Sequence, residues 1–193
     1  MNYLAHAYLS CSNEDVLFGN FIGDSVNAKT DDVYQDEILR GIWLHRQIDS
    51  YTDSHHLIKE AVHIFRPSQS KYAPVVTDIL WDHVLSKYWF RFSGEELRLF
   101  VDGVYGIISS RKKQLPAKLL LKIDQMIAGD FLYRYQTIGG LKTSYGYMDK
   151  RAKFPSNFQN ATEVYQNNQS DLDSIFLEFF PDLISYVEEI CAC

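Results

Sequence analysis

Apolar residues recur every three to four positions along most of this chain, which is the period of a helix packed against a core. The clearest example begins near Asp36, where Ile38, Ile42 and Ile48 fall on one side of a helical wheel and polar residues such as Gln47 on the other. Regular alternation of the kind that strands show is hard to find. The pattern therefore predicts an all-α fold.

The same periodicity divides the chain into a series of predicted helices. They cover residues 2–10, 16–22, 36–53, 57–66, 75–92, 97–109, a segment that starts at residue 116, and residues 171–179 and 182–190. The segment 75–92 is apolar almost all round, which predicts burial on most of its sides. No repeat, low-complexity stretch or linker interrupts the series, so residues 1–193 are predicted to form a single helical-bundle domain.

Capping residues and prolines set the expected ends of these helices. Ser54 is expected to cap the helix that follows it, and Pro67 to stop that helix. Pro74 suits the first turn of the next one. The stretch Ser93–Glu96 has the form of a capping box, and Pro181 is expected to kink or divide the last helical region.

Composition narrows the class of protein. A hydrophobic content of 46% and a charged content of 23% are typical of a soluble globular domain. The net charge of −6 argues against nucleic-acid binding, and no apolar run approaches the roughly 18 residues that span a bilayer. The start of the chain lacks the basic region of a signal peptide, and the odd set Cys11, Cys191 and Cys193 suits a reducing compartment. We expect a cytoplasmic location.

Polar residues interrupt the apolar faces at a few positions. His45 and Asp49 lie among the isoleucines of the 36–53 helix, four residues apart and therefore on one face. An imidazole and a carboxylate in an apolar interior are costly unless they are paired. Two explanations stay open at this point: a histidine–aspartate hydrogen bond within the core, or a metal ion bound at the centre of the domain.

Further residues of this kind come from other predicted helices. The complete set is His6, Asp24, His45, Asp49, Asp78, Asp82 and His83. Any single one of them is ordinarily satisfied by a backbone group or a neighbour. Four carboxylates close together would repel one another, and a divalent cation would remove both the repulsion and the desolvation. Imidazole and carboxylate without thiolate suit Mn²⁺, with Mg²⁺ or Fe²⁺ as alternatives, and argue against a structural Zn²⁺ site.

Several stretches together resemble a known family, the acyl carrier protein phosphodiesterases. The likeness is carried by Asn2–His6, Gly19–Asp24, Leu44–Asp53 and Asp78–His83, and more weakly by Arg134–Tyr135 and Phe179–Pro181. It extends over essentially the whole chain. Some relatives have a histidine where this chain has Trp43, which makes position 43 a poor ligand candidate.

The resemblance implies a metal-dependent, HD-like, all-α hydrolase that removes the 4′-phosphopantetheine arm from holo-acyl carrier protein and leaves the apo form. Two other functions stay open: an HD-like phosphohydrolase acting on a nucleotide or another small phosphoester, and a helical module that binds the carrier protein and catalyses nothing. The oligomeric state is not predicted.

The expected roles follow from the chemistry of a metal-assisted phosphodiester hydrolysis. The predicted metal ligands are Asp24, His45, Asp49, Asp82 and His83, and the predicted catalytic residues are His6 and Asp78. His6 is the candidate general acid or base, and Asp78 is either a further ligand or a supporting residue. Arg46 is a candidate phosphate-binding residue, with a salt bridge to Asp49 or Asp53 as the ordinary alternative. Asp53 is either a ligand or a helix cap.

An acidic carrier protein would need a local basic surface on this acidic chain. Arg111, Lys112 and Lys113 are the predicted docking residues, with Lys118 and Lys122 continuing the positive charge. Lys150, Arg151 and Lys153 form a competing patch. The alternative is that the 111–113 segment is a solvated basic loop without a partner.

Overall fold

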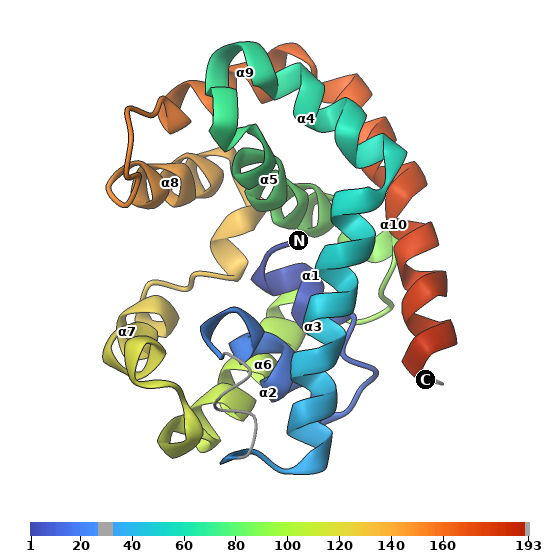
Figure 1. The fold of residues 1–193 in the computed structure, drawn as a ribbon, viewed down its shortest axis with the longest axis vertical. Coiled ribbons are helices and arrows are strands. Elements are labelled where there is room, and N and C mark those ends of the chain that lie inside the picture. Colours follow the sequence, from blue (N-terminus) through green and yellow to red (C-terminus); the bar gives the residue numbers. More distant parts are fainter. Residues whose placement is uncertain (27–32, 192–193) are drawn as a thin grey trace.

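The computed structural model describes residues 1–26 and 33–191, and every regular element in these two ranges is helical (Figure 1). The all-α prediction is thereby confirmed, whereas the HD-like subclass stays a prediction. The α-helices are α1 (Tyr3–Tyr8), α2 (Glu14–Ile22), α3 (Asp36–Ser54), α4 (His56–Gln69), α5 (Ala73–Lys87), α6 (Leu97–Ser110), α7 (Ala117–Ala128), α8 (Ile138–Asp149), α9 (Ala161–Asn167) and α10 (Gln169–Cys191).

Short 3₁₀ turns connect several of these helices. They are η1 (Gly23–Ser25), η3 (Ser70–Tyr72), η4 (Trp89–Arg91), η5 (Lys112–Gln114), η6 (Tyr133–Gln136) and η7 (Phe158–Asn160). None of the helices in the described ranges has the length and apolar character needed to cross a membrane.

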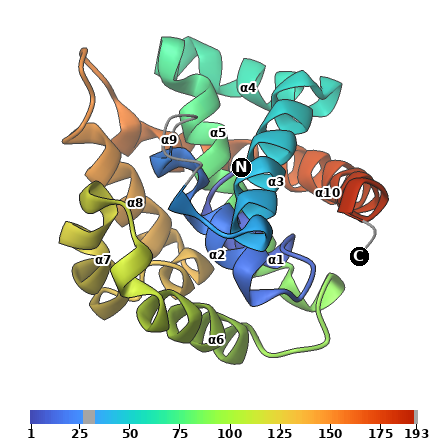
Figure 2. The same cartoon turned by 60° about the horizontal axis from the view of Figure 1, so that its bottom comes forward.

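Helix α5 lies at the centre of the fold, as its uniformly apolar sequence predicts. Leu80, Trp81, Val84 and Leu85 are completely buried, and α1, α4, α8 and α10 pack around this helix. The buried apolar side chains of the described residues form one continuous cluster. Figures 1 and 2 show α10 along one side of the molecule, beside α3, and α7 and α8 on the opposite side.

Helices α2 and α3 approach each other very closely, and glycines permit the contact. A Cβ atom on Gly19 would collide with the backbone of Ile38 and Gly41, and one on Gly41 would collide with the backbone of Val16 and Asn20. Backbones in contact bring the residues at the crossing within hydrogen-bond distance of one another. Asn20 of α2 is thereby held against α3, which positions it for the site described below.

The short helix α1 is fixed by a residue from α5. Both oxygens of the Asp82 carboxylate accept backbone hydrogen bonds from the first turn of α1, from Leu4 N at 2.9 Å and Ala5 N at 3.1 Å. A six-residue helix has little stability of its own, and these bonds satisfy two of its unpaired N–H groups. The position of His6 therefore depends on α5.

Two helix ends, at the start and at the end of α4, lie at other residues than the sequence predicted. Ser54 belongs to α3, and His55 occupies the N-cap position of α4 without a side-chain hydrogen bond. Helix α4 also continues past Pro67 to Gln69. Proline near a helix end removes only one backbone hydrogen bond, and the burial of Phe65 and Gln69 favours continuation.

Three further sequence predictions are wrong. Helix α5 ends at Lys87, well before residue 92. Ser93 does not cap α6, because its hydroxyl accepts a hydrogen bond from Glu95 N at 3.1 Å and α6 begins later. Helix α10 runs through Pro181 as one helix with many buried apolar residues, so the division expected there is wrong, whereas the kink expected as its alternative stays a prediction. Helices α8 and α9 were not predicted.

Candidate metal centre

Two histidines from different helices stack at the junction of α1 and α3. The rings of His6 and His45 are nearly parallel, with an interplanar angle of 19° and centroids 4.0 Å apart. Both side chains are buried. Stacked imidazoles that carried two positive charges would repel each other, so this geometry requires at least one neutral ring.

Asn20 fixes the orientation of the first ring. Its amide nitrogen donates to the carbonyl of His6 at 2.8 Å and to Ser10 Oγ at 3.1 Å, which leaves the amide oxygen as an acceptor. That oxygen lies 2.7 Å from His6 Nδ1. Because an amide oxygen only accepts, His6 Nδ1 donates, and its Nε2 is the unprotonated nitrogen of the neutral ring.

The same residue orients the second ring through its backbone. His45 Nδ1 lies 2.8 Å from the carbonyl oxygen of Asn20 and donates to it. The Nε2 atoms of both histidines consequently face the same space. A ring nitrogen opposite one that donates to an amide or carbonyl oxygen is the usual metal-binding atom of histidine.

Asp49 lies between the two Nε2 atoms. Its Oδ1 is 3.2 Å from His6 Nε2, and its Oδ2 is 3.3 Å from His45 Nε2. Asp24 approaches from η1, with its Oδ1 3.2 Å from His45 Nε2. One ligand atom from each of His6, His45 and Asp49 lies within 4.8 Å of the others, which a single metal ion can bridge.

His45 Nε2 is a buried polar atom without a hydrogen bond. Two carboxylate oxygens lie within ion-pair distance, but neither forms a hydrogen bond of acceptable geometry with this nitrogen. A buried ring nitrogen facing carboxylates is stabilised by a cation in the space between them. The two-histidine, one-carboxylate donor set therefore fits a divalent metal ion.

The amino group of Met1 already places one cation beside this group. Its nitrogen lies 3.3 Å from Asp49 Oδ1 and 3.3 Å from Asp78 Oδ1, so the two carboxylates face the same positive charge. This contact links Asp78 of α5 to the histidine–aspartate group. It also shows that the carboxylates of α3 and α5 converge on a common point.

The two histidines have opposite pKa shifts. Burial, reinforced by the charge of His45, lowers the pKa of His6 to about 4. Burial also acts to lower the pKa of His45, but Asp24 and Asp49 outweigh it and raise that pKa to about 9. In the metal-free protein near neutral pH, His6 is therefore neutral and His45 carries a proton that a metal ion must displace.

The carboxylates are also perturbed. Burial opposes ionisation of Asp49, yet its contacts with His45 and the Met1 amino group hold its pKa well below the usual value. The pKa of Asp24 is lowered by its contact with His45. Burial raises the pKa of Asp78 despite the nearby Met1 amino group. Perturbed carboxylates with opposite shifts are typical of a site that both binds cations and moves protons.

The predicted ligands Asp82 and His83 lie outside the group of three. Both Asp82 oxygens accept hydrogen bonds from the first turn of α1. Burial raises the pKa of this carboxyl to about 7, although those hydrogen bonds act to lower it. His83 Nδ1 donates to the carbonyl of Tyr135 at 2.6 Å, and its ring packs edge-on against Tyr165. The structure brings His6, Asp24, His45, Asp49 and Asp78 together but not His83.

Sequence reasoning missed Asn20, which orients both histidines. Asn20 is completely buried on a helix whose other inward residues are apolar, and it lies within the Gly19–Asp24 stretch. The sequence therefore showed a polar residue on an apolar helix, but its role became visible only when α1 and α3 were seen to pack against it, because its partners His6 and His45 lie on those two helices. Gly23 supports the same geometry, since a Cβ atom there would lie closer than 3 Å to Cβ, Cγ and Cδ2 of His45.

The predicted docking residues are largely paired within the chain. Arg111 Nη2 lies 2.6 Å from Asp15 Oδ1, and Lys112 forms an ion pair with Asp124. Lys113 is exposed on η5. These contacts reduce the positive charge that the 111–113 segment offers to a partner.

Arg46 is exposed on α3. Asp53 is not a helix cap, because it belongs to the last turn of α3, and it lines a groove next to Asp78. Exposed Trp43 points away from the core, which agrees with its exclusion as a ligand.

Lys118, Lys122 and Arg151 form a second set of basic residues. The charges of Lys118 and Arg151 lower the pKa of Lys122 in addition to burial, so the three cations are close together. Within the described ranges none of them has an ion-pair partner. Tyr3 is influenced by Asp24 and by Arg151, which places this cluster within electrostatic range of the site.

Comparison with known proteins identifies the family of this chain. A family model for acyl carrier protein phosphodiesterase matches residues 1–183. Proteins named acyl carrier protein phosphodiesterase from Enterobacter sp. (strain 638) and Klebsiella pneumoniae (strain 342) are 28% and 29% identical, over 95% and 97% of this chain and 96% and 98% of their own lengths. One from Pectobacterium atrosepticum is 36% identical over 61% of this chain and 62% of its own length. No solved structure matches. This chain belongs to the acyl carrier protein phosphodiesterase family.

Proposed function

We propose that this protein is a metal-dependent phosphodiesterase that hydrolyses the bond between 4′-phosphopantetheine and the serine of holo-acyl carrier protein, leaving the apo form. The observation that carries the proposal is the convergence of His6, His45 and Asp49 on one point, where the buried Nε2 atom of His45 faces the carboxylates of Asp24 and Asp49 without forming a hydrogen bond. Membership of the family supports the choice of substrate.

The residues that would hold the metal are His6, His45 and Asp49, with Asp24 and Asp78 beside them. Two imidazoles favour Mn²⁺ or Fe²⁺ over Mg²⁺, which prefers oxygen ligands alone, and we propose Mn²⁺. A bound divalent ion would activate water and neutralise charge on the phosphate. His6 thereby becomes a candidate ligand in place of the proton carrier that its sequence position suggested.

The proton chemistry is assigned to Asp78. Burial raises its pKa, so this carboxyl holds a proton more readily than its neighbour Asp49. The leaving serine alkoxide requires a proton, and a carboxylic acid beside the scissile phosphate can supply it. Asp82 acts indirectly, because it holds the turn that carries His6 in place.

The Lys118, Lys122 and Arg151 cluster is the proposed docking surface for the acidic carrier protein. Its charges are unpaired in the described chain, and exposed Leu121 lies beside it on α7. Reversing Lys118 and Lys122 to glutamate should raise the KM for carrier protein several-fold at low salt, and high salt should reduce the difference. The matched control reverses Lys112 and Lys113, and an equal effect of the control would shift docking back to that segment.

The decisive experiment treats holo-acyl carrier protein with chelator-treated enzyme, with and without added Mn²⁺, and weighs the carrier protein by mass spectrometry. The expected result is loss of the 4′-phosphopantetheine mass only when Mn²⁺ is present. Hydrolysis that is unaffected by chelation would refute metal dependence. An intact carrier protein together with turnover of nucleotides or small phosphoesters would favour the alternative hydrolase. Binding of carrier protein without any turnover would favour a non-catalytic module.

A further inference from the structure

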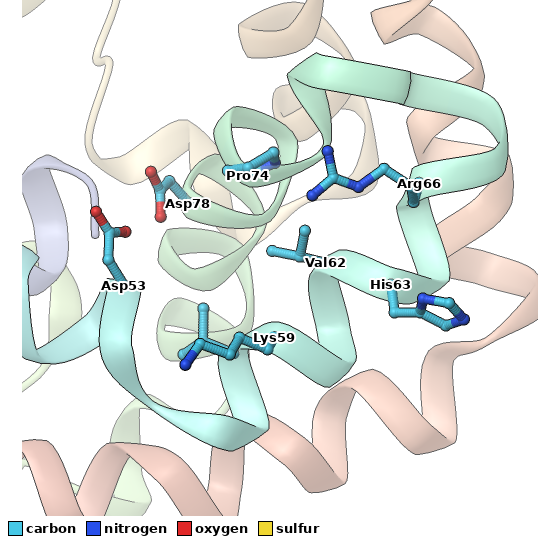
Figure 3. A pocket seen from close by; sticks show the side chains of 8 residues that line it. Asp53, Lys59, Val62, His63, Arg66, Pro74 and Asp78 are labelled. Atoms are coloured by element: carbon cyan, nitrogen blue, oxygen red, sulfur yellow. The ribbon is translucent and has the colours of Figure 1, made fainter.

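A groove between α4 and α5 opens directly beside the candidate metal centre. Its volume is about 330 Å³, within the range of small-ligand pockets. Its walls come from the end of α3, one face of α4 and the start of α5, as Figure 3 shows. The lining residues are Asp53, Ile58, Lys59, Val62, His63, Arg66, Pro74 and Asp78.

The groove and the metal centre share one residue. Asp78 lines the groove, and its Oδ1 lies 3.3 Å from the Met1 nitrogen, which is itself 3.3 Å from Asp49 Oδ1. Two such contacts therefore separate a lining residue of the groove from the candidate metal ligand Asp49. Asp78 thus connects the lining of the groove with the carboxylate that faces both histidines.

The lining combines three kinds of group. Ile58, Val62 and Pro74 provide apolar surface, while Lys59 and Arg66 provide hydrogen-bond donors. Within the described chain Lys59 has no ion-pair partner, and the Arg66 guanidinium makes one 3.3 Å bond to the carbonyl of Ser70, which leaves donors for a ligand. Figure 3 shows Asp53 and Asp78 at one end of the groove and Arg66 and His63 at the other.

We propose that this groove binds the pantetheine part of the substrate arm, an inference that rests on the proposed function. The arm is neutral beyond its phosphate and carries a dimethyl carbon, a hydroxyl and two amides. Val62 and Pro74 suit the dimethyl group, Asp53 suits the hydroxyl, and Lys59 and Arg66 suit the amide carbonyls. The arm enters with its phosphate at the metal centre, and its sulfur end lies toward Arg66.

The lining is less suited to a nucleotide. Nucleotide bases are commonly bound by stacking on aromatic rings. The only aromatic ring among the lining residues is the imidazole of His63, which points away from Asp78 in Figure 3. The groove therefore favours the carrier-protein substrate over the nucleotide substrate that the sequence left open.

The test fills the groove without changing the metal ligands. Val62→Trp places a bulky ring in the groove, and Glu60→Trp, an exposed position on the same helix that does not line it, is the matched control. We expect Val62→Trp to lower kcat/KM on holo-acyl carrier protein at least about tenfold. Mn²⁺ affinity and turnover of methyl 4-nitrophenyl phosphate, which lacks the arm, should stay unchanged in both variants.

A second measurement uses free pantetheine, which has no phosphate, as the probe. Wild-type protein should bind it, measured by calorimetry, and it should compete with holo-acyl carrier protein. Val62→Trp and the milder Arg66→Ala should weaken that binding at least about fivefold, which keeps the test decisive if the tryptophan variant fails to fold.

The outcomes separate the two proposals. One outcome is that wild-type protein releases the arm, and that Val62→Trp, Arg66→Ala and Glu60→Trp all hydrolyse holo-acyl carrier protein and bind pantetheine as the wild type does. The groove assignment is then overturned, and the proposed function stands. If wild-type protein binds pantetheine in the groove but never releases the arm from carrier protein, the groove is supported and the proposed function fails.

Discussion

Helices α3 and α5 each carry a buried histidine near an aspartate, and the two pairs have different surroundings. His45 and Asp49 of α3 are one helical turn apart and face each other, whereas Asp82 and His83 of α5 are adjacent and point in different directions. The α5 pair is satisfied by backbone groups of Leu4, Ala5 and Tyr135. The α3 pair leaves His45 Nε2 without a hydrogen bond.

This difference separates a structural polar pair from a candidate metal site. Burial alone does not distinguish them, since Asp82, His83 and His45 are all almost inaccessible. What matters is whether each polar atom finds a partner inside the protein. Asp82 and His83 form hydrogen bonds to backbone groups of other elements, whereas His45 Nε2 forms no hydrogen bond within the described residues. Four experiments test whether the two pairs differ in this way.

The largest effect is expected from removing the unpartnered nitrogen itself. His45→Ala deletes a proposed ligand, so Mn²⁺ affinity and activity should fall by more than the roughly 10–100-fold that is typical of residues that only support ligands. Calorimetric titration with Mn²⁺ and turnover of holo-acyl carrier protein measure the two losses. His83→Asn is the matched control and should retain Mn²⁺ binding. An equal loss in both variants would remove the distinction between the helices.

His45 of α3 and His83 of α5 should also make the free energy of unfolding depend on pH in opposite directions. The raised pKa of His45 means that its stabilising protonation is complete below pH 6.5 and is lost as pH rises through about 9. The expected loss for chelator-treated protein is of the order of 3 kcal/mol. The lowered pKa of His83 acts in the other direction, because its neutral form is favoured and stability falls below pH 6.5.

Urea unfolding of metal-free protein between pH 5 and pH 10 measures this dependence. His45→Ala should reduce the alkaline loss. The pKa of the Met1 amino group is also raised by Asp78 and Asp49 against its burial, and because this group is present in both proteins, the His45 contribution is taken from the difference between the two curves. A wild-type curve that stays flat from pH 6.5 to 9 would contradict the assigned contacts of His45 with Asp24 and Asp49.

A smaller effect is expected from Asn20, which orients both rings without touching the metal position. Asn20→Ala removes the acceptor of His6 Nδ1 and leaves buried polar groups unsatisfied, so it should cost about 1–3 kcal/mol of stability and about 10–100-fold in Mn²⁺ affinity. Asn20→Asp keeps an acceptor for His6 and should recover part of the affinity. Affinity that is unchanged in the alanine variant would rule out this positioning role.

The smallest effect on metal binding is expected from Asp82. Asp82→Asn disturbs the bonds to Leu4 and Ala5 and should cost about 1–2 kcal/mol of unfolding free energy, with less than a tenfold change in Mn²⁺ affinity. Thermal unfolding and metal titration give the two values. A loss of Mn²⁺ binding as large as that of His45→Ala would make Asp82 a ligand after all, as the sequence suggested.

Much of the fold was readable in the sequence because helices are local. The 36–53 periodicity marks α3 closely, and Asn13, next to the start of α2, caps that helix by accepting hydrogen bonds from Asp15 N and Val16 N. The errors occurred at Pro67, Ser93 and Pro181, where packing against distant helices outweighed a local end signal. Local signals determine where helices form better than where they end.

The sequence by itself also identified the residues that carry the candidate chemistry, because an imidazole or a carboxylate on an apolar face is costly wherever it lies. Only the tertiary structure decided which of them meet. Hydrogen bonds to Asn20 direct His6 and His45 toward Asp49, and backbone contacts engage Asp82 and His83 elsewhere. The physical reason is that a polar atom is satisfied by partners in space, and those partners come from helices far apart in the chain.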